Sequence, residues 1–154
     1  MASFESILVP TDFSAGSYAA LGYAVFLGQR LGSTIEVLAV YEAPLGIDLD
    51  TKVTQPGHAQ PETLSAVLRE STERKLKNFL SDVPGAKGVT LRGRIEQGNP
   101  AEVIVRAARS GGVDLICMGT KGLGSGNHGP VGSVVEKVIR DAPCPVLAVR
   151  VKEA

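Results

Sequence analysis

Short apolar segments that alternate with helix-length segments are the feature that most restricts the fold of this chain. Five segments are short and rich in Val, Ile and Leu, which is typical of β-strands. They span residues 6–10, 34–41, 89–96, 113–118 and 146–151. Between them, apolar residues recur near helical spacing over residues 13–31, 61–83, 100–109 and 132–140. The chain is therefore predicted to be a repeated strand–helix alternation.

This alternation predicts how the strands pair. Strands that are separated by helices pair in parallel, through right-handed crossovers that place helices on both faces of the sheet. Runs that are apolar throughout, such as residues 6–10, suit strands buried on both faces. Residues 89–96 alternate apolar and polar side chains, which indicates a wetter strand at a sheet edge. We predict an α/β fold with an open parallel sheet, in a single domain over residues 1–154.

Local signals mark where two of the helices begin and end. Ser14 is suited to cap the first helix, and Gly32 is suited to stop it. Asn99 is followed by Pro100 at the first helical position and by Glu102 three residues after the cap. This arrangement resembles a capping box.

One segment interrupts the alternation. From Glu42 to Gln60 the chain has two Pro, two Gly and no clean period. Irregular loops of this length are uncommon in compact domains, and they are usually functional or mobile. Pro61 is suited to open the next helix, because its missing N–H costs nothing there. The apolar stripe of that helix is interpreted as core rather than as a partner surface.

Composition excludes several classes of function. Lys and Arg together number 16, as do Asp and Glu, so no net charge favours broad contact with nucleic acid or membranes. Two Cys cannot form a disulfide framework, which indicates a reducing compartment. No apolar segment follows a charged start and no run approaches ~18 apolar residues, so we expect neither a secretory leader nor a transmembrane helix. We expect a cytoplasmic protein.

Ligands of open parallel sheets bind outside the carboxyl ends of the strands. Pro10, Thr11 and Asp12 stand at the end of the first predicted strand. The Asp12 carboxylate can accept hydrogen bonds from ribose hydroxyls or a base amino group, or it can simply cap the first helix. Val40, near the end of the second strand, can present its backbone to a ligand or can be an ordinary buried residue.

The end of the fourth predicted strand, at Met118, leads into the most glycine-rich part of the chain. Eight of the 18 Gly lie between residues 111 and 132. Gly119 lets the backbone approach a ligand without a Cβ in the way, and Gly122 can adopt positive φ. Gly132 and Ser133 open the next helix, where free N–H groups and the helix dipole favour phosphate.

This glycine motif is neither a Walker A loop nor the dinucleotide fingerprint, because its spacing and its place after the fourth strand differ from both. Taken by itself, the motif is also compatible with a mobile loop without function. Lys121 can offer a positive charge to a ligand or can face solvent.

Taken together, these residues resemble the universal stress protein family. The family's ATP-binding signature is G-x-x-G, nine residues, then G-[S/T]. It stands here as Gly119-Thr120-Lys121-Gly122, residues 123–131 and Gly132-Ser133. The flanks also resemble the family, at Ile7-Leu8-Val9-Pro10-Thr11-Asp12, at Gly98-Asn99-Pro100 and at Ala142-Pro143-Cys144-Pro145. The resemblance covers nearly the whole chain.

The resemblance implies an open five-stranded parallel sheet of order 3-2-1-4-5, Rossmann-like and similar to adenine nucleotide alpha-hydrolases. It implies a homodimer joined through the last strand, from Val146 to Val151. It also implies ATP as the cofactor, with Mg²⁺ or Mn²⁺ carried on the phosphates. Residues matching Thr11, Asp12 and Val40 hold adenine and ribose in the ATP-binding branch. The full predicted cofactor site comprises Pro10, Thr11, Asp12, Val40, Met118, Gly119, Lys121, Gly122, Gly132, Ser133 and Val134.

The loop departs from the family pattern by its extra glycines, Gly124, Gly126 and Gly129, and by His128. Glycine has more conformational entropy to lose on ordering, so affinity could be modest or the loop could order only with ligand. His128 could touch a phosphate or be a solvated loop residue.

The leading hypothesis is a dimeric, ATP-binding regulatory or stress-response module. The alternative is a slow ATPase or nucleotidyl-transfer enzyme of the same fold, for which no positioned base or arginine finger stands out. A third hypothesis is a structural partner protein that uses no nucleotide. We predict no catalytic residues, because Ser133 has no nearby sequence partner that resembles a catalytic base. We predict no protein-borne metal site, because no His, Cys and carboxylate set has metal-ligand spacing. Cys117 is interpreted as a buried apolar residue, Cys144 as structural, and His58 as having no role.

Overall fold

A computed structural model describes residues 2–121 and 131–151 of the chain. A central parallel sheet is formed by β1 (Ser6–Thr11), β2 (Thr34–Tyr41), β5 (Thr90–Gln97), β6 (Leu115–Gly119) and β7 (Val146–Val149). Its order is β5-β2-β1-β6-β7. In the numbering of the five main strands this is 3-2-1-4-5, so the predicted fold class and strand order are confirmed.

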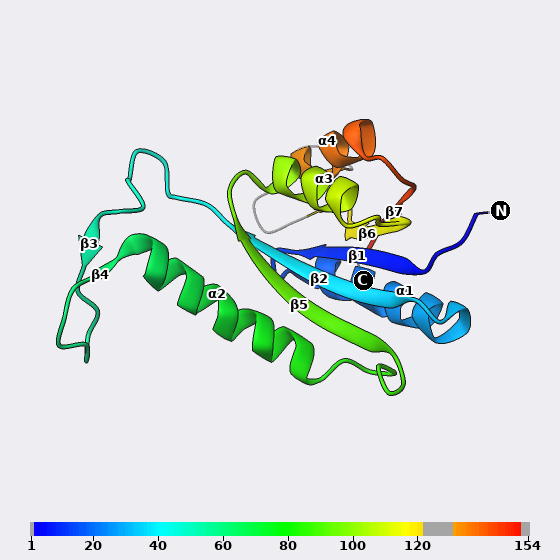
Figure 1. Ribbon diagram of the computed structural model, residues 1–154, viewed down its shortest axis with the longest axis horizontal. Helices are drawn as coiled ribbons and strands as arrows, with labels where there is room; N and C mark the ends of the chain where they lie inside the picture. Colours follow the sequence, from blue (N-terminus) through cyan, green and yellow to red (C-terminus); the bar gives the residue numbers. More distant parts are fainter. Residues whose placement is uncertain (1, 122–130, 152–154) are drawn as a thin grey trace.

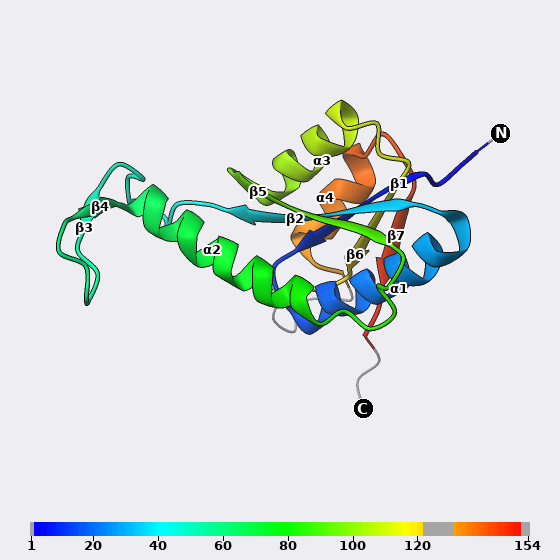
Figure 2. The same cartoon turned by 60° about the horizontal axis from the view of Figure 1, so that its bottom comes forward.

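Four helices cover the two faces of this sheet. They are α1 (Ala15–Leu31), α2 (Leu64–Ser81), α3 (Pro100–Ser110) and α4 (Ser133–Asp141). Helices α1 and α2 lie on one face, and α3 and α4 lie on the other (Figure 2). Neighbouring residues of β1 therefore enter different cores: Ile7 and Val9 pack with α1, whereas Leu8 packs with α3 and α4.

The predicted starts of α1 and α3 are confirmed, and a side chain caps each of these two helices. The Ser14 hydroxyl accepts a hydrogen bond from Ser17 N, and Gly32 ends α1 in the left-handed region at φ 71°. Asn99 Oδ1 accepts from Glu102 N at 3.2 Å, which caps α3 with Pro100 in its first turn. The reciprocal half of a capping box is replaced, since the Glu102 carboxylate lies 3.7 Å from Lys137 Nζ.

The segment after β2 differs from its prediction. It contains β3 (Lys52–Val53), which pairs antiparallel with β4 (Glu62–Thr63), so the chain here is a short hairpin rather than an irregular loop alone. Helix α2 does not begin at Pro61. Thr63 caps it, with its hydroxyl accepting from Ala66 N at 3.1 Å, because Glu62 and Thr63 are held in the hairpin.

The hairpin and the first half of α2 extend beyond the sheet (Figure 1). Only the second half of α2 packs on the main core, through Leu76 and the half-buried Phe79 and Leu80. The prediction that the whole apolar stripe is core is therefore wrong for its N-terminal part, where Leu64, Val67 and Leu68 belong to neither core cluster.

Strand β5 forms one edge of the sheet, as its alternating sequence predicts. Its wetter face carries an ion-pair cluster, in which Arg94 contacts both Glu96 and Glu36. The hydrogen bonds that Arg94 donates to the carboxylates of Glu96 and Glu36 raise the pKa of Arg94, against the opposing effect of burial. Polar side chains on this face match the position of the strand at the periphery.

Candidate functional site

A pocket lies at the carboxyl ends of β1, β2 and β6, beside the start of α4. Strand β1 is the point where the sheet order reverses, because β2 continues on one side of it and β6 on the other. Open parallel sheets bind their ligands at this position. The volume is about 270 Å³, close to the lower end of the roughly 300–1,000 Å³ typical of small-molecule sites.

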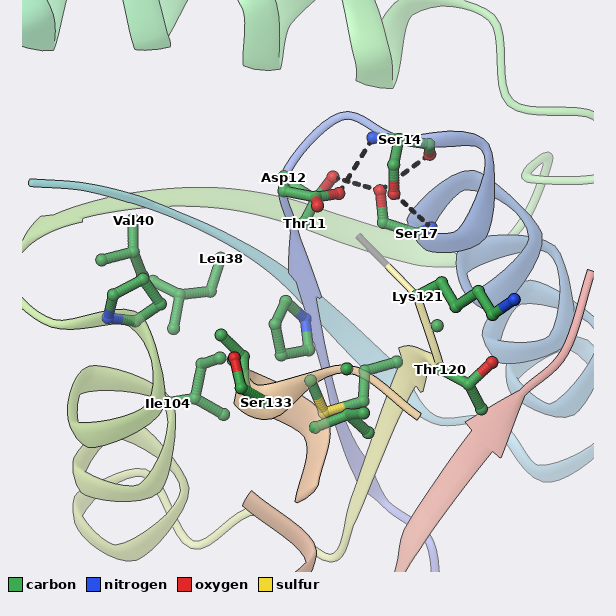
Figure 3. A pocket seen from close by; sticks show the side chains of 17 residues that line it. Thr11, Asp12, Ser14, Ser17, Leu38, Val40, Ile104, Thr120, Lys121 and Ser133 are labelled. Carbon is green, nitrogen blue, oxygen red and sulfur yellow. Dashed lines mark hydrogen bonds between the residues drawn. The ribbon is translucent and has the colours of Figure 1, made fainter. Parts of the chain in front are cut away.

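One side of the pocket is apolar. Leu38 and Val40 come from β2, and Ile104 comes from α3 (Figure 3). Pro100 at the start of α3 and Met118 of β6 extend this lining. Leu38, Ile104 and Met118 are at least 94% buried, so they form a rigid surface that belongs to the α3–α4 core. A flat apolar group such as a nucleobase suits this wall.

The opposite side is polar and comes from the turn between β1 and α1. Asp12 Oδ1 accepts a hydrogen bond from Ser14 N at 3.0 Å. Thr11 Oγ1 accepts from Phe13 N at 2.9 Å and lies 2.8 Å from Ser17 Oγ. Asp12 does not cap α1, because Ser14 holds that position. Asp12 precedes the helix, lines the pocket and is exposed (Figure 3).

The turn has an unusual backbone. Phe13 has φ 65° and is the only non-glycine residue with positive φ within the described ranges 2–121 and 131–151. This conformation is uncommon for a bulky residue, and such strain persists only where the surroundings impose it. The Phe13 ring packs edge-to-face on Phe79 of α2, with ring centroids 5.7 Å apart. The packing of α2 therefore helps to hold the polar side of the pocket.

The end of β6 is held close to α1 by two glycines that face each other. A Cβ on Gly119 would lie 2.7 Å from the carbonyl carbon of Gly16, and a Cβ on Gly16 would lie 2.7 Å from Lys121 O. Neither position has room for a side chain. Gly119 was predicted for close approach to a ligand, and the contact with Gly16 gives it a packing reason as well.

Hydrogen bonds of Thr120, which follows β6, connect it to β7 and to the start of α4. Thr120 N donates to Val149 O at 3.0 Å, and Gly132 N donates to Thr120 O at 2.6 Å. Thr120 is buried, so this junction is a fixed part of the pocket. It places the start of α4 beside the end of β6.

The first turn of α4 faces the pocket through Gly132, Ser133, Val134 and Val135. Gly132 is the N-cap, and within the described part of the chain no side chain caps this helix end. The first N–H groups of a helix lack partners within it, and the dipole is positive there. This end of the pocket therefore suits an anionic group such as phosphate.

The structure gathers the predicted site residues in one place. Ten of the eleven line this pocket: Pro10, Thr11, Asp12, Val40, Met118, Gly119, Lys121, Gly132, Ser133 and Val134. The eleventh, Gly122, lies outside the described residues, as do Gly124, Gly126, His128 and Gly129. Lys121 is exposed, and its side chain extends away from the apolar wall (Figure 3).

Sequence reasoning missed several residues of the pocket and its support. Leu38, Ile104 and Ser17 also line it, and Gly16 supports it through Gly119. Ser17 carried a signal, because it stands three residues after the Ser14 cap, where a side chain returns toward the start of the helix. Gly16 had no local signal, since its partner is about a hundred residues away in sequence.

The cysteines lie away from this chemistry. Cys117 is fully buried in β6, and burial raises the pKa of its thiol to about 12. Burial and the nearby Asp114 carboxylate raise the pKa of Cys144 as well. Neither is a reactive thiolate at neutral pH. Across residues 2–121 and 131–151, no cluster of three His, Cys, Asp or Glu could hold a metal ion, and no helix could span a membrane.

Comparison with known proteins identifies the family. The profile of the Universal stress protein family matches residues 3–150. The chain belongs to the universal stress protein family. A universal stress protein of Methanocaldococcus jannaschii is 33% identical over 147 residues, covering 96% of this chain and 82% of the relative. A universal stress protein of Thermus aquaticus is 34% identical over 152 residues, covering 96% and 99% respectively.

Solved structures of universal stress proteins share the fold. UspA of Lactobacillus plantarum matches with a TM-score of 0.68 and 25% identity, over 97% of this chain and all of that one. Two more distant universal stress proteins were solved as complexes with adenine nucleotides. One, at 22% identity and a TM-score of 0.60, contains cAMP, and one from Archaeoglobus fulgidus, at 17% and 0.57, contains dAMP. Some proteins with this fold therefore bind adenine nucleotides.

Proposed function

We propose that this universal stress protein binds ATP in the pocket at the end of β1 and acts as a dimeric regulatory module of a cytoplasmic stress response. The observation that carries the proposal is the gathering of ten predicted cofactor residues around one pocket. That pocket offers three different surfaces: an apolar wall, a polar turn and the start of helix α4. A nucleotide has three matching parts: base, ribose and phosphates.

Each part of ATP has a matching surface. The base would lie against Leu38, Val40 and Ile104. The ribose would face Asp12, whose carboxylate accepts hydrogen bonds. The phosphates would meet the N–H groups at the start of α4 and the Ser133 hydroxyl. Mg²⁺ or Mn²⁺ would be carried on the phosphates rather than by protein ligands.

The proposed dimer uses the edge of the sheet formed by β7. Strand β7 pairs with β6 on one side and is the last strand in the sheet order. Ala148 in this strand is exposed, and so is Val151 just after it. An open strand edge is a template for pairing with another chain. Pairing of two β7 strands would join the sheets of two copies.

The proposal is tested by ATP titration of the nucleotide-free protein with Mg²⁺, comparing two aspartates. Asp12→Ala should weaken binding by about ten- to a hundredfold, the usual effect of losing a hydrogen bond to a charged group. Asp48→Ala is the matched control, because Asp48 is also exposed and also accepts from the amide two residues later, at 2.8 Å from Asp50 N. It should leave binding unchanged. Equal effects of the two substitutions would contradict the assignment of the site.

A further inference from the structure

The polar side of the pocket contains a continuous series of hydrogen bonds that runs through two buried hydroxyl groups. Thr11 and Ser17 are 7% and 5% exposed. Phe13 N donates to Thr11 Oγ1 at 2.9 Å, the two hydroxyl oxygens are 2.8 Å apart, and Ser17 Oγ donates to Ser14 O at 3.0 Å. The series links the Thr11–Ser14 turn to the first turn of α1 (Figure 3).

Only one placement of the two hydroxyl hydrogens turns all of these contacts into hydrogen bonds. A hydroxyl has one hydrogen to donate. Ser14 O is a carbonyl and can only accept, so the Ser17 hydrogen points to it. The contact between the two hydroxyls must then use the hydrogen of Thr11. Thr11 thus accepts from Phe13, donates to Ser17 and has no hydrogen left for the pocket.

This arrangement makes the part of the pocket formed by Thr11 and Asp12 purely accepting. The Ser14 hydroxyl also lines the pocket; it accepts from Ser17 N at 3.3 Å and can still donate its own hydrogen. Thr11 Oγ1 keeps a lone pair for the pocket but has no hydrogen to offer it, and the neighbouring Asp12 carboxylate accepts hydrogen bonds only. Thr11, Asp12 and Ser17 all line the pocket. A ligand group that donates hydrogen bonds is favoured beside them, and a group that only accepts would meet oxygen lone pairs. A site built this way rejects analogues that lack the donor.

We propose that Ser17 is a specificity-determining positioning residue, which directs the hydrogen of the Thr11 hydroxyl away from the pocket and so makes the Thr11–Asp12 part of the polar side select ligand groups that donate hydrogen bonds. The inference rests on the proposed ATP site and deepens it. The shared chemistry is a hydrogen-bond donor of the nucleoside, either a ribose hydroxyl or the base amino group. Ser17 acts by orienting the Thr11 hydroxyl rather than by bonding to the ligand's hydrogen-bond donor.

The test compares the dissociation constant of ATP with those of three analogues. 2′-Deoxy-ATP and 3′-deoxy-ATP each lack one ribose hydroxyl, and ITP carries a carbonyl oxygen in place of the base amino group. The parent protein should bind at least one analogue about tenfold or more weakly than ATP. The analogue concerned identifies the donor. ATP binding without preference over any of the three would overturn the inference.

Variants then distinguish the effect of the Thr11–Ser17 hydrogen bond on ligand preference from the effect of a general loss of stability. Ser17→Ala releases the Thr11 hydrogen, and Thr11→Val removes the acceptor, so both should reduce that preference about fivefold or more. Thr11→Ser keeps the hydroxyl and should retain the preference. Thr72→Val is the matched control, because Thr72 is a buried hydroxyl of α2 that donates to Leu68 O at 2.7 Å, in a helix turn away from the pocket. Unchanged ratios in Ser17→Ala and Thr11→Val would overturn the inference.

A measurement without ligand distinguishes failure of the inference about Ser17 from failure of the proposed ATP binding. The Phe13 amide should exchange slowly with solvent deuterium in the parent and in Thr11→Ser, and at least tenfold faster in Thr11→Val. Equal exchange in all three proteins would show that this series of hydrogen bonds does not hold the turn. If the series is present but the parent binds no ATP, the proposed function itself fails, and the selectivity built on it fails with it.

Discussion

Two glycines of the same helix should respond to the same substitution with opposite signs. Gly16 lies in the first turn of α1, where an added Cβ would be 2.7 Å from Lys121 O. Gly22 lies two turns later on the exposed side, where an added Cβ would meet nothing within 4 Å. Gly16→Ala and Gly22→Ala therefore add the same methyl group to a tight contact and to open space.

The magnitudes follow from these two environments. Forcing a methyl group against backbone costs about 1–3 kcal/mol, and the higher helix propensity of Ala returns at most about 1 kcal/mol. Gly16→Ala should therefore destabilise the protein by roughly 1–2 kcal/mol, whereas Gly22→Ala should stabilise it by about 0.5–1 kcal/mol. With about 2–4 °C of Tm for each kcal/mol at this chain length, Gly16→Ala lowers Tm by about 2–8 °C. Gly22→Ala raises Tm by about 1–4 °C.

Thermal and urea denaturation of the two variants beside the parent protein measure both effects. ATP binding adds a second readout, because the Gly16 clash falls on the backbone that leads from Gly119 through Thr120 to Lys121. Gly16→Ala should weaken ATP binding, and Gly22→Ala should not. If Gly16→Ala is stabilising to the same extent as Gly22→Ala, the end of β6 is not packed on α1 in the way described, and the reasoning is refuted.

Three further predictions concern other parts of the fold. Asn99→Ala should lower stability by about 1 kcal/mol, because it removes the cap of α3; unfolding in urea measures it, and an unchanged midpoint would contradict the capping role. The raised pKa of Cys117, about 12, keeps its thiol protonated at pH 8, so iodoacetamide should label Cys117 only after unfolding, as peptide mass spectrometry would report. Labelling of Cys117 in the native protein at the unfolded rate would contradict its burial. Arg94→Met should change stability by less than about 1 kcal/mol, because the Arg94 and Glu36 side chains are each 37% exposed and the Glu96 side chain 28% exposed; a loss of several kcal/mol in the same urea assay would show that the cluster is more than a surface network.

The elements that sequence reasoning placed correctly are those with strong local signals. Strand β2 was predicted with its observed bounds, because Thr34–Tyr41 is a β-branched run enclosed by a helix stop and an irregular segment. Helix α1 was predicted through Ser14 and Gly32, whose cap and left-handed backbone are local properties. The order of the sheet followed from the family resemblance rather than from the pattern itself.

The errors lie where local signals compete or where a distant partner decides. Pro61 and Thr63 are both suited to start a helix, and pairing of Glu62 and Thr63 with β3 favoured Thr63. The stripe of α2 has helical periodicity along its full length, but the sheet reaches only its second half. Periodicity reports an amphipathic helix and does not report how much of that helix a partner covers.

Sequence reasoning predicted ten of the residues that line the pocket, but not Leu38, Ile104 or Ser17. Asp12, Val40, Gly132 and Ser133 could be proposed because they follow strands or start a helix at the expected edge of the sheet. The contact of Gly16 with Gly119 and the bond between Thr11 and Ser17 depend on side-chain and backbone geometry that the strand–helix pattern does not contain.

Isothermal titration of the nucleotide-free protein with ATP and Mg²⁺ tests the central claim most directly. One ATP should bind per chain, and the heat should be lost or strongly reduced in Asp12→Ala but retained in Asp48→Ala. A parent protein that shows no saturable binding up to millimolar ATP would contradict the assignment of this pocket as a nucleotide site.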